Sequence, residues 1–366
     1  MKVAIDLTSL ADNFSGIERY AANMAAAIIK QDSANDYVLL FKEAVFPMFE
    51  GGDEQDNVSF VIMPRTKCGK FFSTQIFLPR YLNAVNADVA LFLAFPAPLL
   101  YFGRSISTIH DLCCWDCPET MTVKSRLLWR SLDRKAVCDN SDIISISNFS
   151  KSRIVAHYGI DERKVIVAYC GIDSEVFKPY KSEEFRARVL KRYSLPPRFI
   201  LSLSTLEPRK DLPTLVDAWS SLVKEHDFEY DLVLAGRRGW KLDNLLGRLD
   251  NETRQRVHVT GFIEDEDLPV LYGLCDIFVF PSKYEGFGLP PVEALYSGAK
   301  VICSDIPCLR EICANAASFF SCGSSQSLAH QILLCLDEES PDIRKVMQYS
   351  WRKEAAKIIA AVNRCS

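Results

Sequence analysis

Two glutamates eight residues apart, Glu285 and Glu293, bracket a stretch with the pattern of a junction between a strand and a helix. Residues 278–280 are an apolar run that Pro281 ends. Residues 290–291 are prolines, which suit a first helical turn because N–H groups there lack partners. A loop that opens a helix binds anions, because it presents free N–H groups and the positive end of the helix dipole. Carboxylates, in contrast, accept hydrogen bonds from sugar hydroxyls. The stretch therefore predicts a ligand that is both anionic and rich in hydroxyls, such as a sugar nucleotide.

A pair of cations, Arg209 and Lys210, follows another apolar run at residues 200–204. Arginine binds phosphate with two parallel hydrogen bonds and lysine acts as a point charge, so an adjacent pair at a strand end can clamp a diphosphate. His110 follows the run 106–109, and doubly wound sheets bind ligands at the carboxyl ends of their strands. The alternatives are an ordinary helix N-terminal turn for the cations and a structural core role for His110.

The sequence from Glu285 to Glu293, Glu-Gly-Phe-Gly-Leu-Pro-Pro-Val-Glu, resembles the E-x7-E signature of retaining glycosyltransferases of family 4, which have the two-domain GT-B fold. The resemblance implies that Glu285 contacts the hydroxyls of the donor sugar and that Glu293 holds the ribose. It also implies that the backbone between them faces the sugar and the diphosphate; these residues are Gly286, Phe287, Gly288 and Leu289. The alternative is a strand–turn–helix with solvated glutamates.

Further positions match the same family. Arg209 and Lys210 match the pair that neutralises the leaving nucleoside diphosphate, and His110 matches a histidine beside the donor sugar. Together with Glu285, these are the predicted catalytic residues. Gly16 matches the turn that approaches the donor phosphates, although many relatives have two adjacent glycines there. The remaining donor-binding candidates end strands or border the nucleotide base; they are Ser204, Gly236 and Phe262. Two departures are Cys170, where relatives usually have Asn, and Asp211, which is often Asn.

Strand-like and helical patterns alternate along both halves of the chain, which predicts an α/β fold. The expected architecture is GT-B, with two Rossmann-like, doubly wound parallel-sheet domains facing a central cleft. Strands are expected at 2–8, 37–41, 58–63, 88–95, 106–109, 142–147, 165–167, 200–204, 232–235, 257–260, 278–280 and 299–303. Helices are expected at 17–30, 124–136, 268–274 and 328–336.

The predicted domains are an acceptor-binding domain at 1–180 and a nucleotide-sugar-binding domain at 181–348. In GT-B enzymes the terminal helix, here 349–366, crosses back onto the first domain. The charged segment 181–197 ends in two prolines and is the best linker candidate. A length of 366 residues fits two domains.

Composition excludes several other classes of protein. A hydrophobic share of 48% with 25% charged residues is typical of soluble globular proteins, and no apolar run is long enough to span a membrane. The first residues do not form a secretory signal, which favours the cytoplasm. A net charge of −4 argues against general nucleic-acid binding.

No metal site is predicted. The 13 cysteines are an odd number, and reduced cysteines of a cytosolic protein are the favoured interpretation. The C-x-x-C within 113–117 would need a second ligand pair, from Cys303, Cys308 or Cys313, to hold zinc. The acidic triplet 265–267 resembles the D-x-D metal motif of the other large glycosyltransferase fold. It precedes an expected helix, however, which favours Asp265 as an N-cap.

Two segments mix basic and apolar residues, 65–80 and 124–135. Each is either a core helix with a solvated charged face or a basic amphipathic segment on a membrane surface. These alternatives remain open. The predicted localisation is the cytoplasm, and peripheral contact with the inner face of the membrane is an option.

Together these features predict metal-independent transfer of a hexose from a nucleoside-diphosphate sugar to a hydroxyl of a glycan or lipid-linked glycan in surface polysaccharide synthesis. Bacterial polysaccharide mannosyltransferases are the nearest resemblance, which favours mannose and GDP-mannose, and lipopolysaccharide as the product. No residue stands out as a nucleophile, so the leaving phosphate is expected to accept the proton of the acceptor. The alternatives are a sugar-nucleotide epimerase or hydrolase of the same fold, and a catalytically silent sugar-nucleotide-binding protein.

Overall fold

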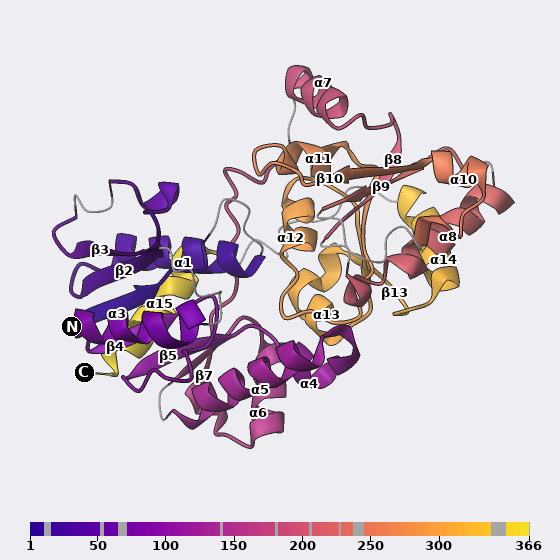
Figure 1. Ribbon diagram of the computed structural model, residues 1–366. Coiled ribbons are helices and arrows are strands. Elements are labelled where there is room, and N and C mark those ends of the chain that lie inside the picture. The colour runs from indigo at the N-terminus through magenta and orange to yellow at the C-terminus, as the bar shows by residue number, and fades with distance from the viewer. Residues whose placement is uncertain are drawn as a thin grey trace. The chain divides into compact units, whose positions relative to one another are not determined.

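The computed structural model describes residues 1–10, 16–51, 55–64, 72–139, 142–179, 182–204, 207–226, 228–236, 245–337 and 349–365. The chain packs as two compact units, each built around a parallel sheet (Figure 1). The first unit contains Met1–Gly171 and Tyr349–Ser366, and the second contains Ile172–Gln348. In the described part of the chain, no helix has the length and apolar character needed to cross a membrane.

The sheet of the first unit has the strand order β3-β2-β1-β4-β5-β6-β7, and all neighbouring strands are parallel. Its strands are β1 (Lys2–Asp6), β2 (Asp36–Lys42), β3 (Val58–Met63), β4 (Val89–Phe92), β5 (Ser105–Ile109), β6 (Ile143–Ser145) and β7 (Val165–Val167). The winding direction reverses between β1 and β4, which is the position where doubly wound sheets bind ligands.

Helices cover both faces of this sheet. They are α1 (Gly16–Gln31), α3 (Leu78–Val85), α4 (Cys113–Asp116), α5 (Val123–Cys138), α6 (Asn148–Tyr158) and α15 (Trp351–Asn363), together with a π-helical turn η3 (Ser73–Phe77) and the short 3₁₀ turns η1 (Pro47–Phe49), η4 (Pro118–Thr120) and η5 (Glu162–Lys164). The basic segment 65–80 falls partly outside the described residues, and its described end forms η3 and the start of α3.

The C-terminal helix α15 packs against α1 in the first unit. The backbone N–H of Tyr169 donates to Glu354 over 3.1 Å, and the rings of Tyr20 and Trp351 lie 5.9 Å apart. Gly171 makes this contact possible, because a Cβ there would lie 2.3 Å from the Trp351 backbone nitrogen.

The sheet of the second unit has the order β10-β9-β8-β11-β12-β13, again with parallel neighbours. Its strands are β8 (Phe199–Leu203), β9 (Asp231–Ala235), β10 (Val257–Gly261), β11 (Ile277–Phe280), β12 (Val301–Ser304) and β13 (Ser318–Phe320). Its helices are α7 (Glu183–Arg192), α8 (Leu212–Glu225), α10 (Asn251–Gln255), α11 (Leu268–Leu274), α12 (Leu289–Tyr296), α13 (Pro307–Cys313) and α14 (Ser325–Asp337), with 3₁₀ turns η6 (Pro208–Lys210) and η7 (Ala314–Ala316). The winding direction reverses between β8 and β11.

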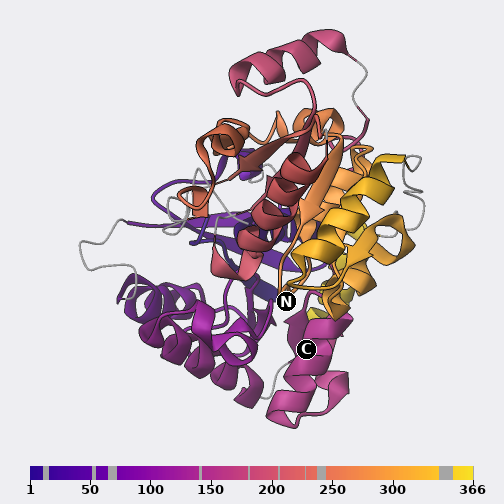
Figure 2. The ribbon, with the colours of Figure 1, turned by 90° about the vertical axis from the view of Figure 1, so that its right-hand side faces the viewer.

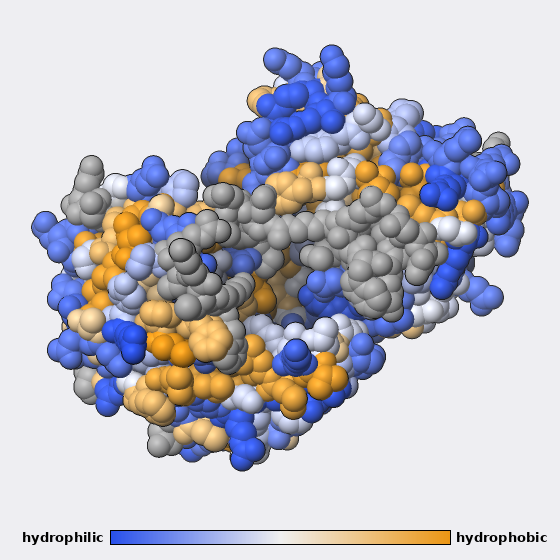
Figure 3. Space-filling view, in the orientation of Figure 1, coloured by the Kyte–Doolittle hydropathy of each residue, from blue (hydrophilic) through white to orange (hydrophobic). Residues whose placement is uncertain are grey.

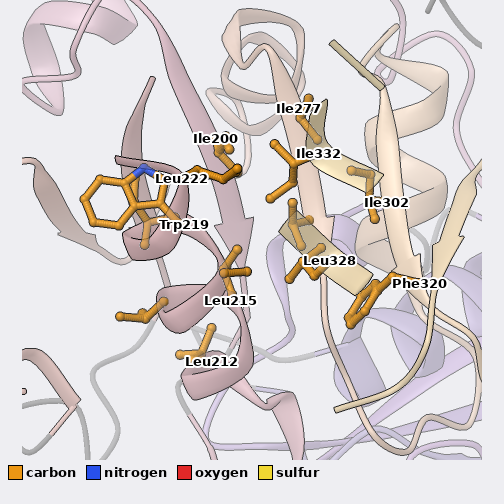
Figure 4. Close-up of a cluster of buried hydrophobic side chains, with 14 of the residues drawn as sticks. Ile200, Leu212, Leu215, Trp219, Leu222, Ile277, Ile302, Phe320, Leu328 and Ile332 are labelled. Atoms are coloured by element: carbon orange, nitrogen blue, oxygen red, sulfur yellow. The ribbon is translucent and has the colours of Figure 1, made fainter. Parts of the chain in front are cut away.

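The core of the second unit lies between this sheet and the helices α8 and α14, which run side by side over one face (Figure 2). Leu212, Leu215, Trp219 and Leu222 lie at helical spacing on α8 and belong to one buried cluster with residues of the strands and of α14 (Figure 4). Trp219 is completely buried, and its indole N–H donates to the Tyr230 carbonyl over 2.8 Å. The core thus fixes the strand ends that carry the candidate site.

Two predictions are wrong in this region. The predicted linker 181–197 contains helix α7, which packs on α11 (Figure 1). Asp265 is not an N-cap, because α11 begins at Leu268 after Asp267. The buried Asp267 carboxylate binds three donors of the 181–197 segment at 2.8–2.9 Å, namely Arg188, Arg192 and Tyr193. Paired charges offset the desolvation of this buried carboxylate, so the acidic triplet anchors α7.

Candidate active site

Arg209 and Lys210 lie in the 3₁₀ turn η6, between the carboxyl end of β8 and the start of α8. Asp211 joins the turn to the helix in the left-handed conformation, with φ of 47°, which Asn and Asp tolerate better than other residues with a Cβ. Its carboxylate accepts from Thr214 Oγ1 at 2.7 Å and pairs with Lys283 Nζ at 2.9 Å. Asp211 therefore suits this left-handed position, as an Asn would.

Glu285 brings its carboxylate to both cations. Lys210 Nζ lies 2.5 Å from Oε1, and Arg209 Nη1 lies 3.3 Å from Oε2 and 3.3 Å from the Tyr284 carbonyl. The three residues meet because β8 and β11 are neighbours at the reversal point of the sheet, and each of the two loops follows one of these strands. These three residues carry two positive charges and one negative charge, and Arg209 Nε also pairs with the carboxylate of Glu207 at 3.4 Å.

Burial and charge act against each other in this cluster. Burial is the largest influence on Glu285 and raises its pKa, but the charges of Lys210 and Arg209 and the hydrogen bond from Lys210 outweigh it, so the net pKa is lowered. Burial lowers the pKa of Lys210, the Glu285 charge opposes this effect, and Arg209 reinforces it. Glu285 therefore favours the charged form of Lys210.

The loop between β11 and α12 requires glycine at position 288. Its φ is 96°, and a Cβ would lie 2.7 Å from Leu309 Cδ2. Gly286 and Phe287 are buried in the same loop, and the Phe287 carbonyl accepts from Cys308 Sγ at 3.4 Å. Leu289 is the first residue of α12, and the prolines follow it in the first turn as predicted.

Glu293 is buried on α12, where its Oε2 accepts a hydrogen bond from Tyr272 Oη at 3.1 Å. Tyr272 belongs to α11 and was not predicted as a site residue. No local pattern relates the two residues, which are 21 positions apart. The two glutamates of the motif thus have different partners, cations for Glu285 and a tyrosine hydroxyl for Glu293.

Ser204, Gly236 and Phe262 follow the neighbouring strands β8, β9 and β10 at the carboxyl edge of the sheet. Gly236 has φ of 120°, and a Cβ there would lie 2.0 Å from the Ser204 carbonyl oxygen, so only glycine fits. The Ser204 hydroxyl is buried and has no hydrogen-bond partner among the described residues. Phe262 follows Gly261 and is partly exposed. These three candidates share one edge with Arg209, Lys210 and Glu285.

His110 and Gly16 belong to the first unit, unlike the other candidates. His110 Nε2 lies 3.1 Å from the Leu93 carbonyl oxygen, and the Tyr20 ring meets the imidazole edge-on at 5.2 Å. Burial lowers the pKa of His110, so the imidazole is neutral near pH 7 and Nε2–H donates to Leu93. Gly16 is the first residue of α1, and residues 11–15 of its loop lie outside the described residues.

Within the described ranges, no three His, Cys, Asp or Glu side chains are placed to hold a metal ion. The 12 cysteines in those ranges are all free. Cys303 and Cys313 are within hydrogen-bonding reach of each other beside Cys308, but they do not form a ligand set with the 113–117 group.

Comparison with known proteins places these motifs in a family. Residues 14–176 match the family model described as Glycosyltransferase Family 4, and residues 184–354 match the one described as Glycosyl transferases group 1. The O-antigen chain mannosyltransferase B of Escherichia coli is 30% identical over 268 residues, covering 70% of this chain and 70% of that protein. The chain belongs to glycosyltransferase family 4.

Other relatives of this family 4 glycosyltransferase agree with that assignment. The serotype-specific mannosyltransferase WbdA of Escherichia coli is 33% identical over 216 residues, which are 58% of this chain and 25% of that protein. The crystal structure of HepE from Anabaena, in complex with UDP and glucose, has a TM-score of 0.72 at 18% identity and covers 99% of both chains. The predicted family, the GT-B fold of two parallel α/β sheets and the glycosyltransferase activity are confirmed.

Proposed function

We propose that this glycosyltransferase transfers mannose, with retention of anomeric configuration, from a nucleoside diphosphate to a hydroxyl of a glycan or lipid-linked glycan. The observation that carries the proposal is the cluster of Arg209, Lys210 and Glu285 at the reversal point of the second sheet. A site that places two cations beside the buried carboxylate of Glu285 suits a ligand with an anionic diphosphate and a hydroxyl-rich sugar.

The cations act on the leaving group in this mechanism. When the anomeric C–O bond of the donor breaks, negative charge grows on the diphosphate, and in this proposal Arg209 and Lys210 stabilise it. The acceptor oxygen forms the new bond to the anomeric carbon on the same face, and its proton passes to the leaving phosphate. Glu285 accepts hydrogen bonds from the hexose hydroxyls and favours the charged form of Lys210.

The remaining candidates of the second unit bind the donor. Glu293, oriented by Tyr272, holds the ribose hydroxyls, and Phe262 borders the base. The backbone of Gly286, Phe287, Gly288 and Leu289 faces the sugar and diphosphate. For the first unit, the family pattern assigns Gly16 to the donor phosphates and the neutral imidazole of His110 to the donor sugar, as a catalytic residue.

Mannose is proposed because two relatives, the O-antigen chain mannosyltransferase B and WbdA, are named mannosyltransferases. GDP-mannose is the donor that fits this proposal, and the acceptor is a growing chain of lipopolysaccharide or another surface polysaccharide. The free cysteines suit the reducing cytoplasm, where we place the reaction.

A panel of sugar nucleotides tests the proposal. GDP-mannose should raise the melting temperature most, because a ligand at 100 times its Kd stabilises the fold by about 2.7 kcal/mol. Transfer of labelled mannose to an oligosaccharide acceptor should follow. Stabilisation by no sugar nucleotide would contradict the proposal, and donor hydrolysis without transfer to any acceptor would assign the site to a hydrolase.

A further inference from the structure

We infer that Asp6 binds a hydroxyl of the acceptor sugar and thereby helps to determine which acceptor is used. Asp6 is the last residue of β1, and the winding direction of the first sheet reverses between β1 and β4. Ligands bind at such a reversal point, at the carboxyl ends of the strands. The inference rests on the proposed function, because it assumes transfer to a sugar hydroxyl, and it adds a residue that recognises this second substrate.

The carboxylate of Asp6 uses only one of its two oxygens within the described part of the protein. Oδ1 accepts hydrogen bonds from the backbone N–H of Thr8 at 3.0 Å and from Thr8 Oγ1 at 2.7 Å. No donor of a described residue is bonded to Oδ2, and no described cation is paired with Asp6. The residue is partly exposed, so a ligand can reach the carboxylate. An ionised carboxylate accepts about four hydrogen bonds, so Asp6 has capacity for a further donor.

Buried carboxylates that hold segments of this protein together bind donors through both oxygens. Asp32 accepts a backbone hydrogen bond on Oδ1 and hydrogen bonds from two side chains on Oδ2. Asp267 binds Arg188 through Oδ1 and Arg192 through Oδ2. Asp6 differs from both, because its two hydrogen bonds come from a single residue of its own turn and connect it to no other element. A role in joining elements therefore does not account for an acid at this position.

An ionised Asp6 has an unfavourable environment in the folded protein. Burial raises the pKa of Asp6, and the hydrogen bonds from Thr8 oppose this effect only in part. The charged form therefore lowers the free energy of unfolding at neutral pH. The acids at the start of α7 are in contrast exposed, on a helix that Figure 3 shows covered largely by hydrophilic side chains; they are Glu183 and Glu184. Groups that reduce stability in this way are typical of binding sites, where function requires them.

The turn that follows β1 supports Asp6 and carries a second polar group. The Leu7 N–H donates to the Leu40 carbonyl over 2.9 Å, and the Leu10 N–H donates to the Leu7 carbonyl over 3.1 Å. The Ser9 hydroxyl in this turn is buried and has no hydrogen-bond partner among the described residues. Buried hydroxyls are normally hydrogen-bonded, so the turn has a second group that a polar ligand can satisfy.

The charge at Asp6 favours a neutral ligand rich in hydroxyls. Sugar hydroxyls donate to a carboxylate, whereas the diphosphate of the donor would be repelled by a carboxylate with no paired cation. In the proposed function, the donor diphosphate is bound by the cluster at the reversal point of the second sheet, which contains Arg209, Lys210 and Glu285. Since the reaction has two substrates, we assign Asp6 at the reversal point of the first sheet to the acceptor.

A double-mutant cycle with modified acceptors tests the inference. The probes are a water-soluble mannoside acceptor and its monodeoxy analogues, each of which lacks one hydroxyl. With the parent, kcat/KM should fall about tenfold or more for the analogue that lacks the hydroxyl bound by Asp6. Asp6→Ala should lose a similar factor on the complete acceptor and little more on that analogue, because the hydrogen bond is already absent. Losses that are equal in parent and variant for every analogue would overturn the inference.

Asp6→Asn separates binding from a structural role. The amide keeps an oxygen for the Thr8 bonds and removes the unfavourable charge, so the melting temperature should equal or exceed that of the parent. The acceptor KM should rise about threefold or more, while the donor KM stays nearly constant. A fall in melting temperature together with an unchanged acceptor KM would assign Asp6 a structural role and overturn the inference.

Asp36→Asn is the matched control, because Asp36 is an exposed acid at the first position of β2 in the same sheet. This variant should match the parent on every acceptor, and an equal rise of the acceptor KM in Asp36→Asn and Asp6→Asn would also overturn the inference. Stabilisation by the donor should be the same in the parent and in both variants. A parent that no sugar nucleotide stabilises would contradict the proposed function instead, so the two proposals can fail separately.

Discussion

Lys210 and Glu285 form a buried ion pair, with Nζ 2.5 Å from Oε1, although 75 residues separate them in the sequence. Each residue compensates for the burial of the other, and the second cation, Arg209, contacts the same carboxylate. The pair therefore links the phosphate-binding and sugar-binding parts of the proposed donor site, and a change in either residue affects both.

Replacement of Glu285 should change the pH dependence of the reaction. Glu285→Gln removes the charge that opposes the lowering of the Lys210 pKa by burial, so this pKa should fall further. Only the protonated ammonium stabilises the diphosphate, so activity is lost as pH rises through the Lys210 pKa. The alkaline limb of kcat/KM should therefore lie at lower pH in the variant. An alkaline limb at the parental pH would show that Lys210 does not depend on Glu285.

Tyr272→Phe should affect donor affinity rather than chemistry. The change removes the hydroxyl that donates to Glu293 and leaves the ring in place. If Glu293 holds the ribose, this contact is similar before and during bond cleavage, so its loss appears mainly in KM. We expect KM for the donor to rise about threefold to tenfold at a nearly constant kcat. Glu293→Gln should also lower the affinity for free nucleoside diphosphate, measured by calorimetric titration. Unchanged affinity in both variants would show that Glu293 does not hold the ribose.

Activity should survive excess EDTA. In this account Arg209 and Lys210 take the part that a divalent ion would otherwise play at the diphosphate. Asp267 of the acidic triplet is occupied by Arg188 and Arg192. Loss of transfer with chelator, followed by rescue with manganese, would contradict this assignment and identify a metal site.

Gly236→Ala should destabilise the second unit by on the order of 3 kcal/mol, because it adds a clash with the Ser204 backbone to a positive φ. Gly159→Ala is the matched control: its φ is 63°, but no atom lies within 4 Å of the added Cβ. In the control, the free energy of unfolding should fall by only about 1 kcal/mol. Urea denaturation, monitored by circular dichroism, compares the stability of the two variants. An equal loss of unfolding free energy in both would show that the added Cβ at position 236 does not clash with Ser204.

Local patterns in the sequence were sufficient to predict the motif and the strand ends around it. The glycines, the prolines of α12 and the glutamates all act within nine residues, so their spacing predicts the loop. Contacts between distant segments leave no such local pattern. The pairing of Lys210 with Glu285 and the hydrogen bond from Tyr272 to Glu293 depend on which strands and helices become neighbours. The anchoring of α7 by Asp267 also depends on a contact between distant segments. The charged composition of 181–197 alone favoured a linker.

The strand β13 was also missed. Ser318–Phe320 is only three residues long, which is too short to show a periodic pattern, and the strand is defined by its pairing with β12.

The departures from the family pattern had different outcomes. Asp211 is explained by its left-handed conformation, whereas nothing in the structure explains why Cys170 stands where relatives have Asn.

The central claim is that Arg209 and Lys210 stabilise charge that grows on the leaving diphosphate, and steady-state kinetics of Arg209→Ala tests it most directly. Arg198→Ala, which removes an exposed arginine paired with Glu229 in the same unit, is the control. Arg209→Ala should lower kcat on the order of 10²–10³-fold while the donor KM changes much less, and Arg198→Ala should match the parent. A parental kcat in Arg209→Ala, or a change confined to KM, would contradict the claim.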